Sequence, residues 1–87
     1  MYGQINTKRR SRCMLHKDKL REFERWLVGQ GYKPQALKDY EVLRMTHPRH
    51  KTVIVWAKLD ATTHYTTQGE SGIKLAEWLE QRKGKDR

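Results

Sequence analysis

The spacing of apolar residues predicts a first amphipathic helix over residues 12–28. Leu20, Phe23 and Leu27 recur at i, i+3 and i+7, which places them on one face of an α-helix. Two glycines follow directly, and glycine commonly ends helices. We therefore expect the helix to end there and residues 32–39 to form a connector.

Three later segments have the composition of β-strands. Residues 40–46, 51–58 and 61–67 are rich in β-branched and aromatic side chains. The connections at 47–50 and 59–60 are short enough for antiparallel hairpins. The pattern therefore predicts three consecutive antiparallel strands.

A second helix is predicted over residues 72–83. Ser71 is a suitable N-cap, Leu75 and Leu79 share one face, and Gly84 follows the last helical residue. The element order is then α-β-β-β-α. We expect an α+β fold in which two helices pack on one face of a three-stranded antiparallel sheet.

The opposite face of that sheet would remain uncovered. Both faces of the first two strands carry apolar or aromatic residues, so alternation does not identify which face is open. Tyr40 and Trp56 are candidates for it, together with Arg44. On an open face they would stack on unpaired bases or anchor a protein interface. His64 is expected on the sheet surface beside Trp56.

Composition adds a strong positive charge to this picture. The 87 residues suffice for one domain and carry a formal net charge of +9. No apolar run approaches the roughly 18 to 20 residues of a membrane span. A single cysteine excludes an intramolecular disulfide and fits a reducing cytoplasm. We expect a basic flexible arm at 1–12, one α+β domain at 13–83 and a basic tail at 84–87.

The positive charge gathers in blocks, which indicates a contact surface. The arm contains four bases and no acid, whereas residues 68–81 carry a local charge of −2. Lys17, Arg21 and Arg25 follow at i, i+4 spacing and would form a basic ridge on the first helix. The residues predicted to contact an anionic partner are Lys8, Arg9, Arg10, Arg12, Lys17, Arg21, Arg25, Arg44, His47, Arg49, His50, Lys51, Lys83 and Lys85.

The histidines raise the question of catalysis. His50 and His64 each begin a His-x-Thr tripeptide, the pattern by which two-histidine phosphoesterases place an acid and a base. The predicted strand pairing puts His64 opposite Val55 or Trp56, about 17 Å from His50 at roughly 3.3 Å per residue. An acid and a base so far apart cannot act on one substrate. We therefore predict a protein that is not an enzyme and has no small-molecule substrate.

Metal binding is the second chemical option. Cys13-x-x-His16 and His47-x-x-His50 supply four side chains of the types that bind zinc. The 30 residues between the two pairs are unlike the spacing of compact zinc modules. Cys13 and His16 also fall on the predicted apolar helix face. We expect no metal and no cofactor.

The predicted topology resembles the double-stranded RNA-binding domain, which is also α-β-β-β-α and contacts RNA through its first helix and first hairpin loop. Pro48-Arg49-His50 lies where that family has a Pro-x-His. The family's second helix opens with adjacent lysines that hold phosphates. Here the segment is Ser71-Gly72-Ile73-Lys74, between Glu70 and Glu77, so the phosphate clamp is missing.

A second resemblance covers roughly residues 17–80. The run Trp26-Leu-Val-Gly-Gln-Gly-Tyr32, the segment Tyr40-Glu-Val-Leu-Arg44 and the strand His64-Tyr-Thr66 are similar to small accessory proteins of short-tailed bacteriophages. This resemblance implies a role in host takeover in the bacterial cytoplasm, and it supplies no site residues.

Two hypotheses follow from charge and resemblance together. In the first, a monomer or weak dimer binds nucleic acid through the arm, the ridge and the loop at 47–51. In the second, the same charges dock on an acidic surface of a host enzyme or defence complex and block its nucleic-acid site.

Overall fold

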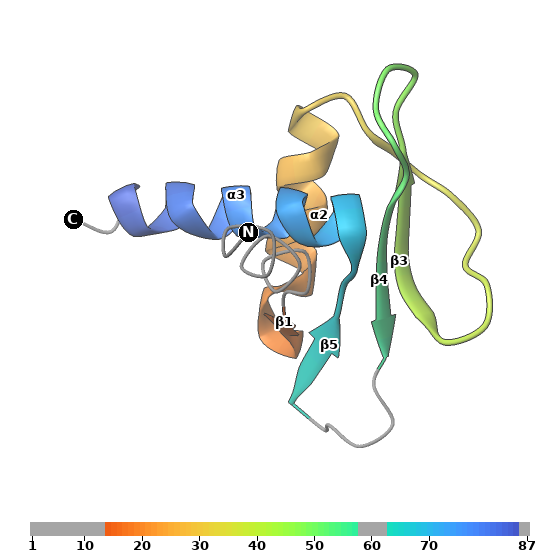
Figure 1. Cartoon of the computed structure of the whole chain (residues 1–87), viewed down its shortest axis with the longest axis horizontal. Coiled ribbons are helices and arrows are strands. Elements are labelled where there is room, and N and C mark those ends of the chain that lie inside the picture. The colour runs from red at the N-terminus through yellow and green to blue at the C-terminus, as the bar shows by residue number, and fades with distance from the viewer. Residues whose placement is uncertain (1–13, 58–62, 86–87) are drawn as a thin grey trace, which may run out of the picture.

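The computed structural model describes residues 14–57 and 63–85. Two helices cover one face of an antiparallel sheet (Figure 1). In chain order the elements are β1 (Met14–His16), a 3-10 turn η1 (Lys17–Lys19), α2 (Leu20–Gly29), β2 (Lys33–Pro34), β3 (Glu41–Thr46), β4 (Val53–Ala57), β5 (His64–Thr66) and α3 (Gly69–Lys85). The α+β prediction is confirmed, but the prediction of three strands is wrong because the sheet has five, in the order β1-β5-β4-β3-β2.

The additional strand β1 replaces the predicted start of the first helix. Leu15 is 1 % exposed between two exposed neighbours, which is the alternation of a strand. Its partner across the pair with β5 is Tyr65. The His16 Nδ1 then accepts the Asp18 N–H at 3.1 Å and begins the 3-10 turn. The α-helix therefore starts only at Leu20, where the apolar i, i+3, i+7 spacing also starts.

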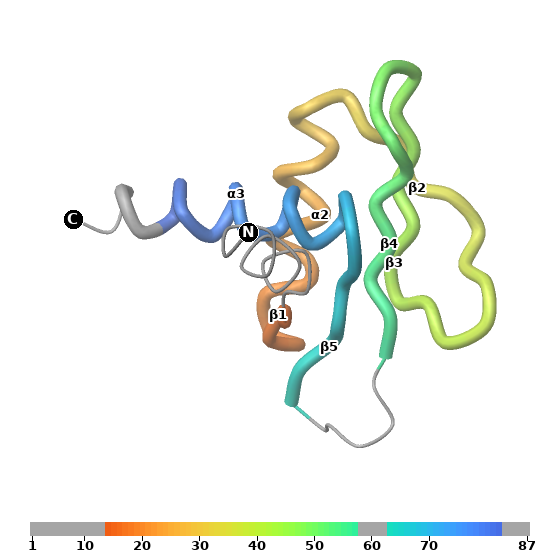
Figure 2. The backbone as a smooth tube through the Cα atoms, viewed as in Figure 1, coloured from red at the N-terminus to blue at the C-terminus, as the bar shows by residue number. Residues whose placement is uncertain are grey.

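The second additional strand, β2, lies in the predicted connector. Lys33 pairs with Thr46, and Pro34 pairs with Met45. Because β2 is an edge strand, the missing N–H of the proline is tolerated there. Figure 2 follows the chain from α2 through β2 and a wide loop on the outer side of the sheet into β3.

The end of α2 determines where β2 begins. Gly31 has φ +101°, a left-handed value that glycine adopts without strain. Its N–H bonds the Val28 carbonyl, and the Tyr32 N–H reaches back to the Leu27 carbonyl, which is the Schellman pattern of helix termination. This turn brings Tyr32, only 3 % exposed, into the core.

The core lies between the helices and the inner sheet face. Phe23 and Leu27 from α2 and Leu75 and Trp78 from α3 are buried. The sheet contributes Leu15, Leu43, Met45, Val53 and Val55. Residues that alternate with these along β3 and β4, including Arg44, Ile54 and Trp56, therefore face outward on the open side.

Ser71 has a different role from the predicted N-cap. The helix α3 begins at Gly69, and Ser71 is buried within its first turn. The Ser71 Oγ accepts the Ile54 N–H at 2.8 Å. Since β5 pairs with β4 only at Trp56 and Ala57, Ser71 satisfies a β4 amide that lies beyond the end of β5. Gly84 does not end the helix either, because α3 continues to Lys85.

Candidate nucleic-acid interface

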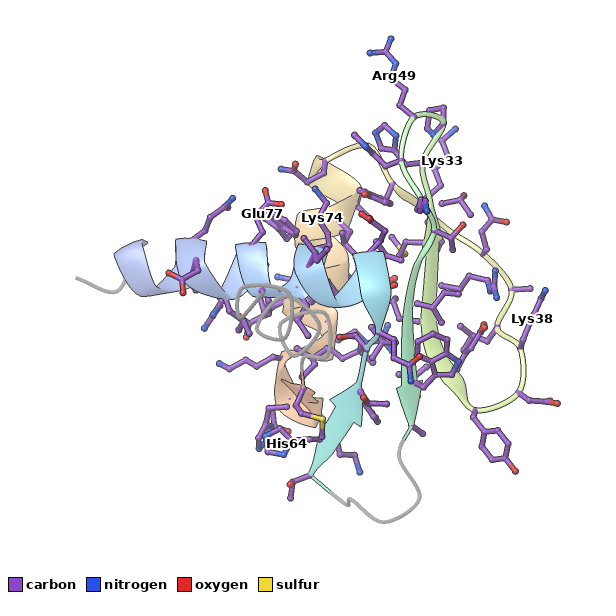
Figure 3. All side chains as sticks on the ribbon, in the orientation of Figure 1. Lys33, Lys38, Arg49, His64, Lys74 and Glu77 are labelled. Atoms are coloured by element: carbon purple, nitrogen blue, oxygen red, sulfur yellow. The ribbon has the colours of Figure 1, made fainter. Side chains whose placement is uncertain are left out.

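The loop between β3 and β4 forms one end of the sheet. Residues 47–51 extend beyond the helices, and the Arg49 side chain points away from the body of the protein (Figure 3). The Arg49 N–H bonds the His47 Nδ1 at 2.9 Å and fixes the turn. An Nδ1 that accepts this bond carries no proton, so the neutral His47 ring has its proton on Nε2.

Three rings pack together beneath this loop. The Tyr32 and His47 centroids lie 4.9 Å apart, and those of His47 and His50 lie 4.4 Å apart. A Cβ built on Gly31 would approach the His47 Nε2 to 3.0 Å. The cluster therefore depends on glycine at position 31, both for its backbone conformation and for space.

A cavity of about 350 Å³ lies between this loop and α3. Lys74 extends toward it from the helix (Figure 3), with its Nζ 3.3 Å from a Glu77 carboxylate oxygen. The same Nζ lies 5.9 Å from the Tyr32 ring centroid. The cavity is lined by Tyr32, Arg49, His50, Lys51, Val53, Glu70, Ile73, Lys74 and Glu77.

We name this region the hairpin end and define it as Tyr32, Lys33, residues 47–51 and Lys74. Lys33, Arg49 and Lys51 are exposed and form no ion pair with any described residue. Lys33 belongs here because it pairs with Thr46, the residue before the loop. Cations from the hairpin and from α3 thus line one cavity beside the ring cluster, and Lys33 adds a cation at the same end of the sheet.

The predicted ridge on α2 is less uniform. Arg21 and Arg25 are exposed and one helical turn apart, but Lys17 lies in the 3-10 turn rather than on the α-helix. Arg21 is 3.4 Å from a Glu24 carboxylate oxygen. A nearby acid therefore offsets part of the ridge's charge.

Arg44 is engaged in an ion pair. Its Nε and Nη2 donate to the two Glu41 carboxylate oxygens at 2.9 and 2.7 Å. The Glu41 side chain is 4 % exposed, and it also accepts the Lys38 N–H. The hydrogen bond from Arg44 is the main reason that the pKa of Glu41 falls to about 2. The Lys38 bond ties the β2–β3 loop to Glu41, and the two-pronged ion pair within β3 leaves Arg44 little capacity for a phosphate.

The aromatic candidates lie together on the open sheet face. Tyr40 is 65 % exposed, and it lines a cavity of about 420 Å³ together with Trp56. The expectation that His64 lies beside Trp56 is wrong. Trp56 pairs with Thr66, whereas His64 pairs with His16 at a centroid distance of 4.9 Å.

The four proposed zinc ligands do not come together in the described residues. His47 and His50 are adjacent at the hairpin end, but His16 lies on β1 beside His64. Cys13 lies outside the described residues. The described segments contain no group of three His, Cys, Asp or Glu side chains suited to a metal ion.

Sequence reasoning missed three residues of the hairpin end: Tyr32, Lys33 and Lys74. The first two were assigned to a connector, and Lys74 was discounted because of its acidic neighbours. The glycine before Tyr32 was a usable signal, because a helix that ends there directs the next residue back into the core. Lys8, Arg9, Arg10 and Arg12, and the side chains of Lys83 and Lys85, lie outside the described part of the structure.

No protein-family model, curated protein or solved structure matches the chain. Neither described helix is long and apolar enough to pass through a membrane. The function must therefore be inferred from the geometry of the chain's own residues.

Proposed function

We propose that this protein binds nucleic acid and that the hairpin end is its main contact with the phosphate backbone. The observation that carries the proposal is that Lys33, Arg49 and Lys51 lie at one end of the sheet and that none of them forms an ion pair with a described residue. An unpaired surface cation gives up no protein partner when it meets a phosphate. Each such contact also releases counterions from the nucleic acid.

The ring cluster supports the same function. Tyr32 is buried beneath the loop, so it holds both imidazoles in place. His50 lies at the cavity, where its ring N–H can donate to a phosphate oxygen. Lys74 adds a cation positioned by Glu77. The arrangement combines exposed cations on the rim with a packed aromatic base.

The arm from Lys8 to Arg12, the ridge and the tail would extend the contact along the nucleic acid. Binding is proposed without a cofactor and without catalysis, by a monomer or weak dimer. The proposed setting is the bacterial cytoplasm during phage infection, and this part rests on the sequence resemblance alone.

An acidic host protein is the second candidate partner. Glu70 and Glu77 line the same cavity as the cations, and Ile73 beside them is 49 % exposed. A mixed-charge rim around an exposed apolar residue suits a protein surface better than a phosphate backbone. Such a complex would inhibit a host enzyme or defence complex by covering its nucleic-acid site.

Fluorescence anisotropy with labelled DNA and RNA separates the two partners. We expect direct binding whose logarithmic affinity falls linearly with the logarithm of salt concentration. Arg49→Gln should reduce the salt slope by about 1, because it removes a phosphate contact. The control Lys19→Gln removes the same charge from a residue already near Glu22, and it should change the slope less.

A different pattern of binding would contradict the nucleic-acid proposal. If the protein binds neither DNA nor RNA at low salt but captures one host protein from nuclease-treated lysate, the nucleic-acid proposal is wrong. Loss of that capture in Arg49→Gln would then assign the hairpin end to a protein partner.

A further inference from the structure

The cavity on the open sheet face differs in chemistry from the cavity at the hairpin end. It is formed where β3 begins and β4 and β5 end, and it measures about 420 Å³, within the roughly 300–1,000 Å³ of small-ligand sites. Its lining residues are Tyr40, Trp56, Ala57, Thr66 and Gln68. None of these carries a charge, so the cavity suits a neutral planar group rather than a phosphate.

The two aromatic side chains are free to stack on such a group. Phe23, Trp26 and Trp78 are held by contacts with other rings or with cations. Within the described part of the chain, no ring or cation stacks on Tyr40 or Trp56. Tyr40 is 65 % exposed, and the partly exposed Trp56 lines the same cavity, so both side chains can be reached by a partner.

The backbone holds Tyr40 firmly at the edge of the cavity. Its φ is +64°, in the left-handed region that a bulky side chain rarely occupies. The Tyr40 carbonyl accepts the Ala57 N–H at 2.7 Å, and the Glu41 N–H bonds the Lys38 carbonyl. A bulky residue kept in an unfavourable conformation beside a cavity is a reason to look for a binding role.

We propose that this cavity binds one unpaired base of a single-stranded nucleic acid, between Tyr40 and Trp56. The inference rests on the proposed function and narrows it to single strands. Aromatic stacking accepts any base, and Thr66 and Gln68 offer hydrogen-bonding groups for a base edge.

The open face also provides a route from this cavity to the hairpin end. Lys33 pairs with Thr46, the neighbour of buried Met45, so Lys33 lies on the outward side. Trp56 follows Lys51 by five positions along β4 and its approach, about 17 Å at roughly 3.3 Å per residue. Lys38, two residues before Tyr40, is an exposed cation without an ion-pair partner among the described residues. A short single strand can thus place phosphates on cations at both ends of the face.

The test compares an oligothymidylate of about 12 nucleotides with an abasic strand that has the same number of phosphates. We expect the protein to prefer the thymidylate and expect Tyr40→Ala to weaken its binding about 5- to 150-fold. Abasic binding should not change. Tyr40→Phe keeps the ring and should behave as the native chain, whereas Arg49→Gln should weaken both strands alike.

Tyr40→Asn is a second variant that removes the ring and should keep the fold, because asparagine adopts positive φ readily. It should lose the preference for thymidylate while its thermal stability is maintained. Equal binding of the two strands by the native chain would overturn the base site, as would an unchanged preference in Tyr40→Asn. Either result would leave the proposed phosphate binding at the hairpin end unaffected.

Two further outcomes concern the proposed function itself. If the native chain binds neither strand, both the proposed function and the base site are wrong. If Tyr40→Asn affects only capture of a host protein, the occupant is a protein side chain and the base site is wrong.

Discussion

The hairpin end and the α2 ridge contain similar numbers of cations but differ in how those cations are held. At the hairpin end, Arg49 and Lys51 have no ion-pair partner among the described residues, and they flank a rigid ring cluster. On the ridge, Arg21 lies 3.4 Å from a Glu24 carboxylate oxygen. A count of charges treats the two surfaces as equal. The ion pairs indicate which cations of each surface are free to meet an anion. Among the described residues, Arg49 and Lys51 are free in this sense, whereas Arg21 on the ridge and Lys74 at the hairpin end are held by glutamates.

The two surfaces are also built from different elements. The ridge is a regular helix face, where acids one turn away are natural partners for arginines. The hairpin end gathers side chains that are distant in sequence, and of its cations only Lys74, which lies on a helix, has an acid partner among the described residues. Cations on hairpin loops can therefore remain without a partner where cations on a helix, such as Arg21 and Lys74, find an acid one turn away.

The largest expected effect comes from Gly31→Val. The substitution places a branched side chain at φ +101° and near the His47 Nε2, so we expect a loss of roughly 1–3 kcal/mol in the free energy of unfolding. Urea denaturation measures this loss. The affinity for nucleic acid should also fall when it is measured under conditions in which both proteins are folded. Val28→Ala, an exposed change on the same turn, is the control and should have little effect. Unchanged stability in Gly31→Val would show that the ring cluster does not need the glycine.

A smaller effect, in the opposite direction, tests the role of ion pairing on the ridge. Glu24→Gln should release Arg21, and affinity for nucleic acid should rise about two- to tenfold because a surface pair contributes little to stability but holds the cation. The matched control is Glu80→Gln, which removes one acid from α3 where no described partner is recorded. An equal rise in both variants would mean that only the total charge matters.

The third and smallest prediction concerns Glu41, which pairs with Arg44 on the open face. Its pKa in the folded protein is about 2, below the ordinary 4.5. Folding therefore favours the carboxylate, and the stability that this contributes is present above pH 4.5 and is lost as the pH falls toward 2. We expect the stability difference between the native chain and Glu41→Gln to shrink over that interval in thermal unfolding. A difference that does not change with pH would contradict the assigned ion pair.

The sequence predicted the two helices and the central strands because their patterns are local. The apolar spacing of Leu20, Phe23 and Leu27 and the β-branched residues around Val53 each identify an element. Strands of two or three residues, such as β1 and β2, are too short to show a period. A register irregularity between Glu41 and Leu43 further obscured the alternation in β3. Edge strands were therefore missed while the centre of the sheet was predicted.

The residues of the candidate site were likewise predicted only where they are neighbours in the sequence. Arg49, His50 and Lys51 are consecutive in sequence and were recognised together. Lys33 and Lys74 reach the hairpin end only through strand pairing and helix packing, so no local pattern could assign them. The error at His64 came from assuming a two-residue turn after β4, because the observed register pairs Trp56 with Thr66.

The central claim is that the unpaired cations of the hairpin end, rather than positive charge in general, bind the phosphates. The most direct measurement compares the salt dependence of affinity for two double variants that each remove two charges. We predict that Arg49→Gln with Lys51→Gln lowers the slope by about 2. Lys19→Gln with Arg21→Gln removes two cations that already lie 3.7 and 3.4 Å from glutamate oxygens, and it should lower the slope by less than about 1. Equal losses in the two variants, or a larger loss in the variant that removes the paired Lys19 and Arg21, would contradict the claim.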